Sequence, residues 1–323
     1  MKKIFALVLV LAMVFALVSC NNTKNDDVVV RVAALNGPTG MGMVQVIEND
    51  STGVSKNDYE FTLASNPTEI SAAVIAGTVD IAAVPVNLAA TLFNKPDVDI
   101  SFAAINTLGV LYILENGNTV NSLSDLNGKK IYATGQGSTP QYILEYLLEK
   151  NGIEVAEIEY IAEHAELATK LASNDAAIGL LPEPQVTVAM NTAAKNGNTG
   201  LRVAVDVTAE WEKLGEGQLV QGCIIVSNTF KEEHPEQFEA IMEEYKAAAA
   251  FVAASPKEAS QLIAKHGIVA QAALAEKAIP NCNICCIDGE DGISYMKNIL
   301  EVLYTANPKS VGGALPADEF YGK

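Results

Sequence analysis

Residues 69–93 read EISAAVIAGTVDIAAVPVNLAATLF and place a helix, a strand and a second helix in close succession. The first helix is predicted over residues 69–76 and ends at Gly77, because glycine adopts the left-handed conformation that often closes a helix. Residues 79–84 are apolar except for Asp80, which predicts a buried strand. Strands without polar alternation are typical of parallel sheets that helices cover on both faces. The segment therefore predicts an α/β fold.

The same alternation extends along the chain in both directions. Further strands are predicted at residues 28–35, 59–64, 100–105, 130–134, 157–161, 176–181 and 201–207. Further helices are predicted at residues 41–48, 86–93, from 140 onward, 165–172 and 185–195. An alternation that occurs in two successive blocks indicates two α/β units.

Two longer strand-like runs, residues 108–115 and 219–227, bracket the second unit. The helices predicted after them show no further strand alternation, and we expect them to pack on the first unit. We therefore predict two doubly wound lobes joined by two crossover strands, with residues 28–112 and 222–323 in lobe I and residues 113–221 in lobe II. A ligand would lie in the cleft between hinged lobes, beyond the carboxyl ends of the strands.

The first residues have the pattern of a lipoprotein leader. Two lysines precede the uncharged apolar residues 4–18, which are few for a membrane span of about 20 residues. Ser19-Cys20 then resembles the lipobox at which bacterial lipoproteins are cleaved and diacylated. We expect residues 1–19 to be a signal peptide, Cys20 to be lipidated and residues 20–27 to form a polar tether. The mature domain would then work outside the cytoplasm, anchored to the cell membrane.

The charge balance excludes one class of partner. The chain has 39 acidic and 21 basic residues, for a net charge of −18. A nucleic-acid partner would require clustered lysines and arginines to replace the phosphate counterions. Only Arg31 and Arg202 are arginines, so bidentate clamps for an anionic ligand are scarce.

Two glycine-containing loops are candidates for binding a ligand. Residues 36–42, NGPTGMG, contain three glycines, which let backbone amides approach a ligand closely. Residues 135–140, GQGSTP, precede an amphipathic helix that Ser138 or Thr139 would cap, with Gln141 completing a capping box. Free amides at such a terminus favour an anionic or strongly dipolar ligand group.

A third loop, residues 181–185, reads LPEPQ and presents Glu183 at a corner stiffened by two prolines. Each of the three loops could by itself be a plain connecting turn. Their occurrence in both predicted units favours a ligand-binding cleft.

Several segments resemble one family, the substrate-binding proteins of ABC importers for nitrate, sulfonates, taurine and thiamine precursors. The resemblance rests on residues 123–130 before 135–152, on the helix-Gly-x-x-Asp step of residues 75–82, and on the ending Gly312-Gly313-Ala314-Leu315-Pro316 with Phe320-Tyr321. It implies a periplasmic-binding-protein fold of type II and delivery of a small molecule to a permease with its ATPase.

The resemblance also implies which residues contact the ligand. Carried over by position, they are Gly37, Pro38, Thr39, Gly40, Met41, Asn66, Pro85, Asn87, Gly137, Ser138, Thr139 and Glu183. The arginine that some oxyanion-binding members use has no evident counterpart. We therefore expect a neutral or weakly charged ligand, of heterocyclic or amide-like character, whose apolar part Met41, Tyr142 or Trp211 could cover.

Catalytic and metal chemistry find little support in the sequence. Gly135-Gln136-Gly137 lacks the third glycine of a dinucleotide fingerprint, and the three histidines are expected on solvated faces. Residues 282–286, CNICC, could ligate zinc, but no second matched pair of ligands exists. A disulfide among the four non-lipidated thiols, or buried free thiols, is the favoured reading.

The sequence thus predicts an extracytoplasmic solute-binding lipoprotein of an ABC importer, without cofactor, metal or catalytic residues, that works by hinge closure. Two alternatives stay open. One is an enzyme of thiamine-pyrimidine synthesis on the same fold, against which the lipobox argues because the related fungal enzymes are cytosolic. The other is a ligand-sensing module for a signalling partner.

Overall fold

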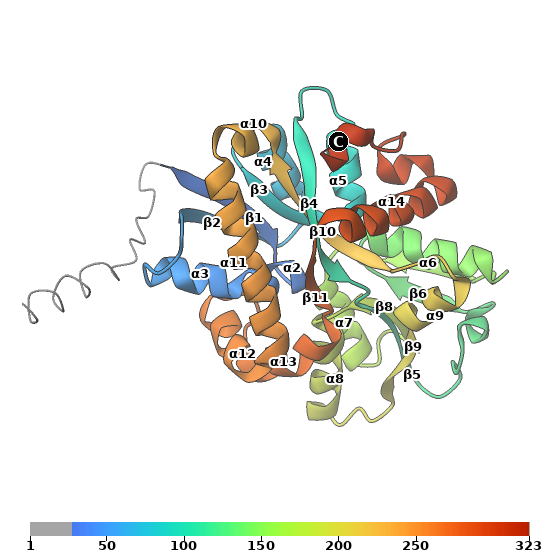
Figure 1. The fold of residues 1–323 in the computed structure, drawn as a ribbon. Helices are drawn as coiled ribbons and strands as arrows, with labels where there is room; N and C mark the ends of the chain where they lie inside the picture. The colour runs from blue at the N-terminus through green and yellow to red at the C-terminus, as the bar shows by residue number, and fades with distance from the viewer. Residues whose placement is uncertain (1–27, 323) are drawn as a thin grey trace, which may run out of the picture.

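The computed structural model describes residues 28–322 (Figure 1). The predicted signal peptide, Cys20 and the tether lie outside the described residues. Within residues 28–322, no helix combines the length and apolar character needed to cross a membrane.

Lobe I is built on a six-stranded sheet with the strand order β11-β4-β10-β3-β1-β2. Its strands are β1 (Val29–Leu35), β2 (Asp58–Ala64), β3 (Ile81–Pro85), β4 (Ile100–Leu108), β10 (Val220–Ser227) and β11 (Ile284–Ile287). The helices that cover it are α2 (Pro38–Gly42), α3 (Val44–Ser51), α4 (Pro67–Ile75), α5 (Val86–Phe93), α10 (Asn228–Glu233), α11 (Pro235–Ala254), α12 (Pro256–Lys265), α13 (Ala272–Ala278) and α14 (Gly289–Ala306). Short 3₁₀ turns complete the lobe at η2 (Ile279–Asn281), η3 (Pro308–Val311) and η4 (Asp318–Tyr321).

Lobe II is built on a five-stranded sheet with the order β7-β6-β8-β5-β9. Its strands are β5 (Leu111–Asn116), β6 (Lys130–Ala133), β7 (Glu157–Tyr160), β8 (Ile178–Pro182) and β9 (Leu201–Asp206). Its helices are η1 (Leu123–Leu126), α6 (Thr139–Lys150), α7 (His164–Ala172), α8 (Gln185–Lys195) and α9 (Val207–Leu214). The predicted α/β class with two lobes is confirmed, whereas the predicted residue boundaries of the lobes stay a prediction.

Four details differ from the sequence-based expectations. Both sheets are mixed: β10 runs antiparallel to β3 and β4, and β5 runs antiparallel to β8 and β9, because each enters its sheet directly from the other lobe. The predicted strand over residues 108–115 is two strands in different sheets, separated by Gly109-Val110. The cysteine-rich segment adds a strand, β11, and the predicted helix over residues 41–48 is divided at Met43 into α2 and α3.

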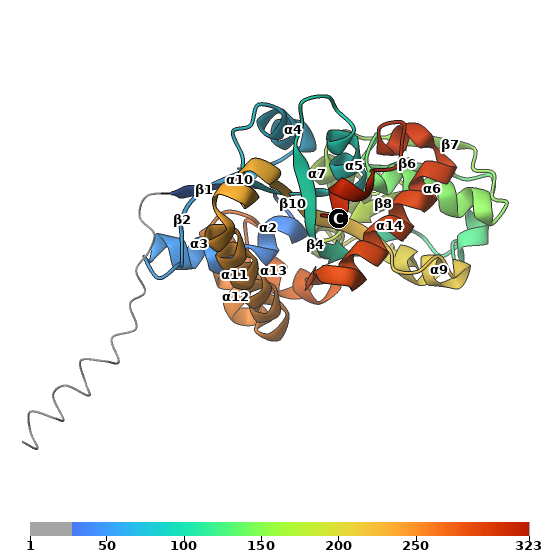
Figure 2. The same cartoon turned by 45° about the horizontal axis from the view of Figure 1, so that its top comes forward.

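The lobes pack against each other on both flanks of the crossovers. On one flank α14 of lobe I lies beside α6 of lobe II, as Figure 2 shows. There Leu300 and Leu303 belong to the same buried apolar cluster as Leu147. On the other flank α13 contacts α8. The two crossover segments therefore run through an interior bounded on both sides by helices.

Gly109 sits where the chain first leaves lobe I for lobe II. A Cβ at this position would lie 2.1 Å from Oγ1 and 3.0 Å from Cγ2 of Thr208, the second residue of α9. The missing side chain is what lets α9 close over the crossover. Close backbone approach of this kind fixes how the two sheets are joined.

We expect Gly109→Ala to lower the stability of the protein by about 1–3 kcal/mol, because the added methyl overpacks the crossover. Adding Thr208→Ala should recover part of this loss, since it removes both the hydroxyl and the methyl that the new Cβ meets. Thermal unfolding of the single and double variants checks the coupling. Equal losses in the single and double variants would contradict this account of the crossover.

Candidate functional site

Gly222 of β10 lies at the centre of a floor where the two crossovers meet the carboxyl end of β3. Its backbone pairs with Pro85 of β3 on one side and with Thr107 of β4 on the other. The register between β10 and β4 shifts on both sides of Gly222, and such bulges often lie beside functional sites. A Cβ on Gly222 would come within 2.5 Å of Asn106 Oδ1 and 3.3 Å of Thr39 Cγ2. The glycine therefore lets these two side chains meet over the sheet.

The floor contains buried polar groups without partners. Asn106 has no exposed surface, yet neither its Oδ1 nor its Nδ2 forms a hydrogen bond. Thr107 Oγ1 and Gln221 Nε2, from the adjoining positions of β4 and β10, are also buried and unpartnered. Leaving one such group unsatisfied costs about 1–3 kcal/mol. Their concentration at the crossovers calls for a functional explanation.

Sequence reasoning missed Asn106, Thr107 and Gln221. The sequence does contain a signal for these residues: polar side chains in otherwise apolar strands. Asn106-Thr107 closes a mostly apolar strand, and Gln221 interrupts the apolar run Leu219–Val226. Asn106 and Thr107 lie between the predicted strands 100–105 and 108–115, and Gln221 lies inside the predicted crossover over residues 219–227.

The first predicted loop, residues 36–42, forms the turn into α2 beside this floor. Gly37 precedes the helix with φ 122°, Pro38 is its first residue, and the hydroxyl of Thr39 donates to Leu35 O at 2.8 Å. Met41 is fully buried in the apolar cluster that also contains Val252 and Ile263. The structure thus brings Thr39 to the floor and places the Met41 side chain in the core of lobe I.

Gly40 and Asn66 have visible structural roles. A Cβ on Gly40 would lie 2.8 Å from Leu35 O, so the turn needs glycine there. Asn66 follows β2 and caps α4: its side chain accepts hydrogen bonds from the amides of Thr68 and Glu69. Asn66 is exposed, next to Ser65, whose hydroxyl accepts a hydrogen bond from Asn36 Nδ2.

Asn87 joins the two lobes directly. Its Nδ2 donates to Gly137 O at 3.3 Å, and its Oδ1 accepts from Thr139 Oγ1 at 2.9 Å. It lies in the first turn of α5, immediately after β3 and Pro85. The predicted residues Asn87, Gly137 and Thr139 are therefore in contact, through hydrogen bonds that cross from lobe I to lobe II.

The start of α6 differs from the predicted capping box. Ser138 is the N-cap residue, but its side chain forms no capping hydrogen bond. Instead the Gln141 side chain accepts from the amide of Gly137 at 2.7 Å. The box fails because the Ser138 amide instead donates to Gly135 O at 3.0 Å. The Ser138 hydroxyl remains half-buried beside the inter-lobe contact.

Glu183 lies at the seam between β8 and α8 and is only 2% exposed. The amide and hydroxyl of Thr187 each donate to its carboxylate at 3.0 Å, and Asn281 Nδ2 of lobe I approaches at 3.5 Å. Burial raises the pKa of the Glu183 carboxyl, and these donors oppose that rise without cancelling it. Burial, with Asp206 and Glu183 nearby, also raises the pKa of Tyr112 to about 12.

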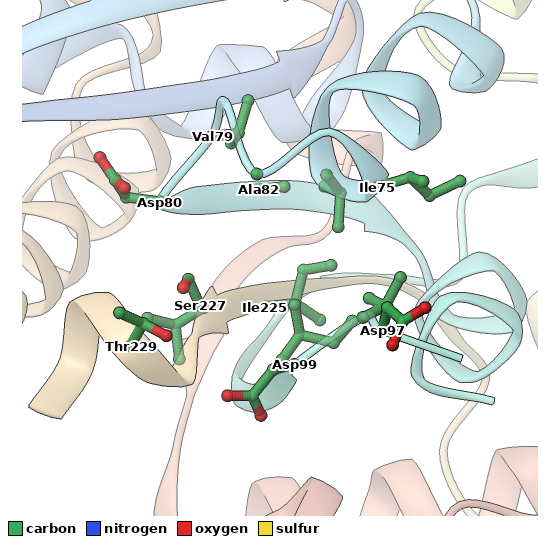
Figure 3. Close-up of a pocket in the computed structure, with 14 residues that line it drawn as sticks. Ile75, Val79, Asp80, Ala82, Asp97, Asp99, Ile225, Ser227 and Thr229 are labelled. Carbon is green, nitrogen blue, oxygen red and sulfur yellow. The ribbon is translucent and has the colours of Figure 1, made fainter. Parts of the chain in front are cut away.

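A separate cavity lies at the opposite edge of lobe I (Figure 3). It has a volume of about 180 Å³ and lies between the start of β3 and the end of β10, with Asp80, Asp99 and Ser227 in its wall. None of the predicted contact residues lines it. Asp80 binds Arg31, and Asp99 accepts from Asn228 at 2.6 Å, so two of its carboxylates already have partners.

A family model described as NMT1/THI5 like matches residues 58–259. This chain belongs to the NMT1/THI5-like family. Solved structures share its fold: an ABC transporter protein from Parabacteroides distasonis has a TM-score of 0.75 at 24% identity, over 91% of this chain and 98% of that one. The alkanesulfonate-binding protein SsuA from Xanthomonas axonopodis pv. citri, bound to MOPS, has a TM-score of 0.68 at 13% identity, over 91% and 96%.

The aliphatic sulphonate binding protein SsuA from Escherichia coli aligns with a TM-score of 0.68 at 15% identity, over 88% of this chain and 90% of that one. No curated protein sequence shows significant similarity to the chain. The predicted family and the type II periplasmic-binding-protein fold are confirmed.

Both arginines of this NMT1/THI5-like protein are bound within their own lobes. Arg31 forms a salt bridge with the buried carboxylate of Asp80 at 2.5 Å. Arg202 forms one with the buried Glu115 at 2.6 Å and also donates to Val120 O. Each guanidinium therefore satisfies a carboxylate of its own lobe. Neither arginine is left to bind a ligand at the floor or at residues 135–140, the loop before α6 (the α6 loop).

The sequence leaves more than one role open for Trp211 and for the four cysteines, and the structure favours structural roles in this NMT1/THI5-like protein. Trp211 is fully buried and packs against Tyr146, with ring centroids 5.5 Å apart. The four thiols of Cys223, Cys282, Cys285 and Cys286 are free. Among the described residues no cluster of His, Cys, Asp and Glu could hold a metal ion.

The expectation of solvated histidines is wrong for two of the three. His266 is mostly buried and lies 2.7 Å from Glu48. His164 shares a hydrogen bond with Thr134 Oγ1 at 2.7 Å, and burial lowers its pKa. Both begin or end helices that pack on their lobes, a placement that sequence spacing does not reveal.

We expect Glu183→Gln to stabilise the protein near neutral pH. A carboxyl whose pKa is raised on folding stabilises the folded state below its ordinary pKa of 4.5, and this contribution is lost as pH rises through the folded pKa. The difference in Tm between Glu183→Gln and wild type should therefore be near zero at about pH 4 and grow toward pH 7.

Thr187→Val supplies the companion variant, because it removes a donor to the carboxylate and should steepen the loss of stability with pH. A Glu183→Gln variant that is less stable than wild type across the whole range would show that the carboxylate is ionised and stabilising.

Proposed function

We propose that this protein is an extracytoplasmic solute-binding protein that captures a small molecule between its lobes and delivers it to the permease and ATPase of an ABC importer. The observation that carries the proposal is the set of buried, unpartnered polar groups at the floor, Asn106, Thr107 and Gln221. They lie where the two lobes are joined, and a guest molecule can satisfy them. The printed descriptions of the structural neighbours as an ABC transporter and as sulfonate-binding proteins support the same role.

Binding is favoured over catalysis by the chemistry of the floor. The side chains of Thr39, Asn106, Thr107 and Gln221 provide hydroxyls and amides, which orient a ligand but offer no amine or thiolate for covalent chemistry. Cys223, the nearest thiol in β10, is fully buried, and burial raises its pKa, which suppresses the reactive thiolate. An enzyme of pyrimidine synthesis would require reactive groups at this position.

Capture would proceed by hinge closure. Lobe I contributes the floor and Asn87, and lobe II contributes the loop from Gly137 to Thr139. A ligand that contacts both sets stabilises the closed arrangement over the open one by its differential affinity. The hydrogen bonds of Asn87 with Gly137 and Thr139 join the lobes at this point and support it as the place where closure is completed.

The ligand is a neutral or weakly charged compound in this proposal. Both arginines are bound to carboxylates, and the buried charged side chain within the three predicted loops is Glu183. Backbone amides of residues 137–139 and the side-chain amides of the floor suit a dipolar group better than a full negative charge.

Anchoring through Cys20 remains part of the proposal. The leader and the small residue before the cysteine are its support. Cys20→Ala should move the protein from the membrane fraction to the soluble fraction of its native host, because lipid anchoring requires the thiol. Membrane association that persists in this variant would contradict lipidation at Cys20.

The α6 loop offers a matched test of the site. Gly137 and Gly197 have nearly equal φ values, 74° and 75°, and each has open space where a Cβ would stand. Alanine at either position should therefore lower stability by a similar small amount, about 1 kcal/mol. Gly137→Ala and Ser138→Ala, each made alone, should weaken binding. Gly197→Ala should not, because Gly197 follows α8 and lies outside the predicted loops.

The measurement is the rise in Tm that a fractionated small-molecule extract of the host produces in wild type and in each variant. We expect the rise to shrink for Gly137→Ala and Ser138→Ala and to persist for Gly197→Ala. An equal rise in all four proteins would place the site elsewhere.

A further inference from the structure

We propose that Asn106 determines the ligand class, by forming two hydrogen bonds to a neutral edge that carries one donor and one acceptor side by side, as in a lactam or a cyclic urea. The inference rests on the proposed solute-binding function and names what that site recognises.

The Asn106 side chain is placed to recognise a ligand rather than to support the fold. A carboxamide offers a donor and an acceptor from one planar group, and its natural complement is another cis-amide edge. In this structure both atoms are buried and unpartnered, so the amide supports no turn, cap or strand. Asn66, by contrast, caps α4: it accepts hydrogen bonds from the amides of Thr68 and Glu69 and donates one to the Glu69 carboxylate. A group left unsatisfied at both ends is held for a partner outside the chain.

The surroundings of Asn106 keep the amide in one orientation. Its Oδ1 occupies the position that a side chain on Gly222 would need, and Thr39 Cγ2 lies against the same position. The shifted register around Gly222 brings Thr107 Cβ to the same place, 3.4 Å from where that Cβ would be. Asn106 Oδ1 therefore lies in the side-chain space that Gly222 leaves free, and this enclosed position favours one orientation of the amide before a ligand arrives, which lowers the entropic cost of recognition.

The charges around the floor distinguish a neutral edge from an oxyanion. Recognition of a sulfonate or nitrate calls for arginine forks or other cations, whereas Arg31 and Arg202 are each bound to a buried carboxylate. The unpartnered floor groups balance donors with acceptors: Asn106 supplies both, Gln221 adds a donor, and the Thr107 hydroxyl can serve as either. A neutral ligand with paired donors and acceptors satisfies them, whereas an anion would leave the acceptor atoms unpaired.

Ligand-observed saturation-transfer NMR tests whether Asn106 recognises a cis-amide edge, with three defined probes at millimolar concentration. 2-Pyrrolidone has the cis-amide edge, N-methyl-2-pyrrolidone keeps the ring but lacks the donor, and methanesulfonate is the oxyanion. We expect a signal from 2-pyrrolidone alone. A signal from methanesulfonate without one from 2-pyrrolidone would overturn the edge reading while leaving solute binding intact. No signal from 2-pyrrolidone would also overturn it.

Asn106→Leu is the matched variant, because leucine has the same number and branching of side-chain atoms without polar groups. It should abolish the 2-pyrrolidone signal while Tm stays the same or rises, since an unsatisfied amide is removed from the interior. Ser101→Ala is the control: Ser101 carries another buried, unpartnered hydroxyl on β4, at its far end. It should keep the signal.

A marked fall in Tm for Asn106→Leu with the 2-pyrrolidone signal retained would assign the amide a structural role and refute the proposal. If leucine does not fit beside Gly222, Asn106→Ala provides the second variant, and it too should lose the signal. Signal retained in a folded Asn106→Ala protein would contradict the inference.

Discussion

The two passages of the chain between its sheets constrain most of this structure. At the first, Gly109 lies against Thr208 so closely that no side chain is possible, and at the second Gly222 yields its side-chain space to Asn106. These contacts fix how lobe I is joined to lobe II. The carboxyl end of β3 and Thr39 of α2 meet at Gly222, and the loop before α6 bonds to Asn87 in the first turn of α5. The same glycines that allow the lobes to be joined therefore also create the floor of the proposed site.

Satisfied and unsatisfied polar groups are distributed unevenly over the molecule. Asp80 and Glu115 are buried carboxylates that arginines and backbone amides satisfy within their own lobes. Burial alone would raise the pKa of Glu115, but hydrogen bonds from Thr119 and Val120 and the charge of Arg202 outweigh it and hold that pKa below its ordinary range. The floor has no such compensation. The two carboxylates are satisfied within their own lobes, while Asn106, Thr107 and Gln221 at the junction keep free hydrogen-bonding capacity.

The sequence predicted the architecture well because apolar strands and capped helices are local signals. The segment from Gly77 to Phe93 is a strand and helix in the structure as expected, and the predicted contact residues Asn87 and Thr139 are hydrogen-bonded to each other. The misses arise from relations that no local pattern encodes. Strand direction in β5 and β10 depends on entry from the other lobe, β11 forms only because β4 offers it an edge, and the role of Asn106 depends on a glycine more than a hundred residues away in sequence.

A crystal structure of the protein purified from its native host without dialysis tests the central claim most directly. The account predicts a neutral small molecule enclosed between the lobes, with one donor and one acceptor on the Asn106 amide and the loop from Gly137 to Thr139 closed over it. A molecule bound instead in the cavity beside Asp80 and Ser227, or an Asn106 amide paired only with water while a ligand lies elsewhere, would contradict it.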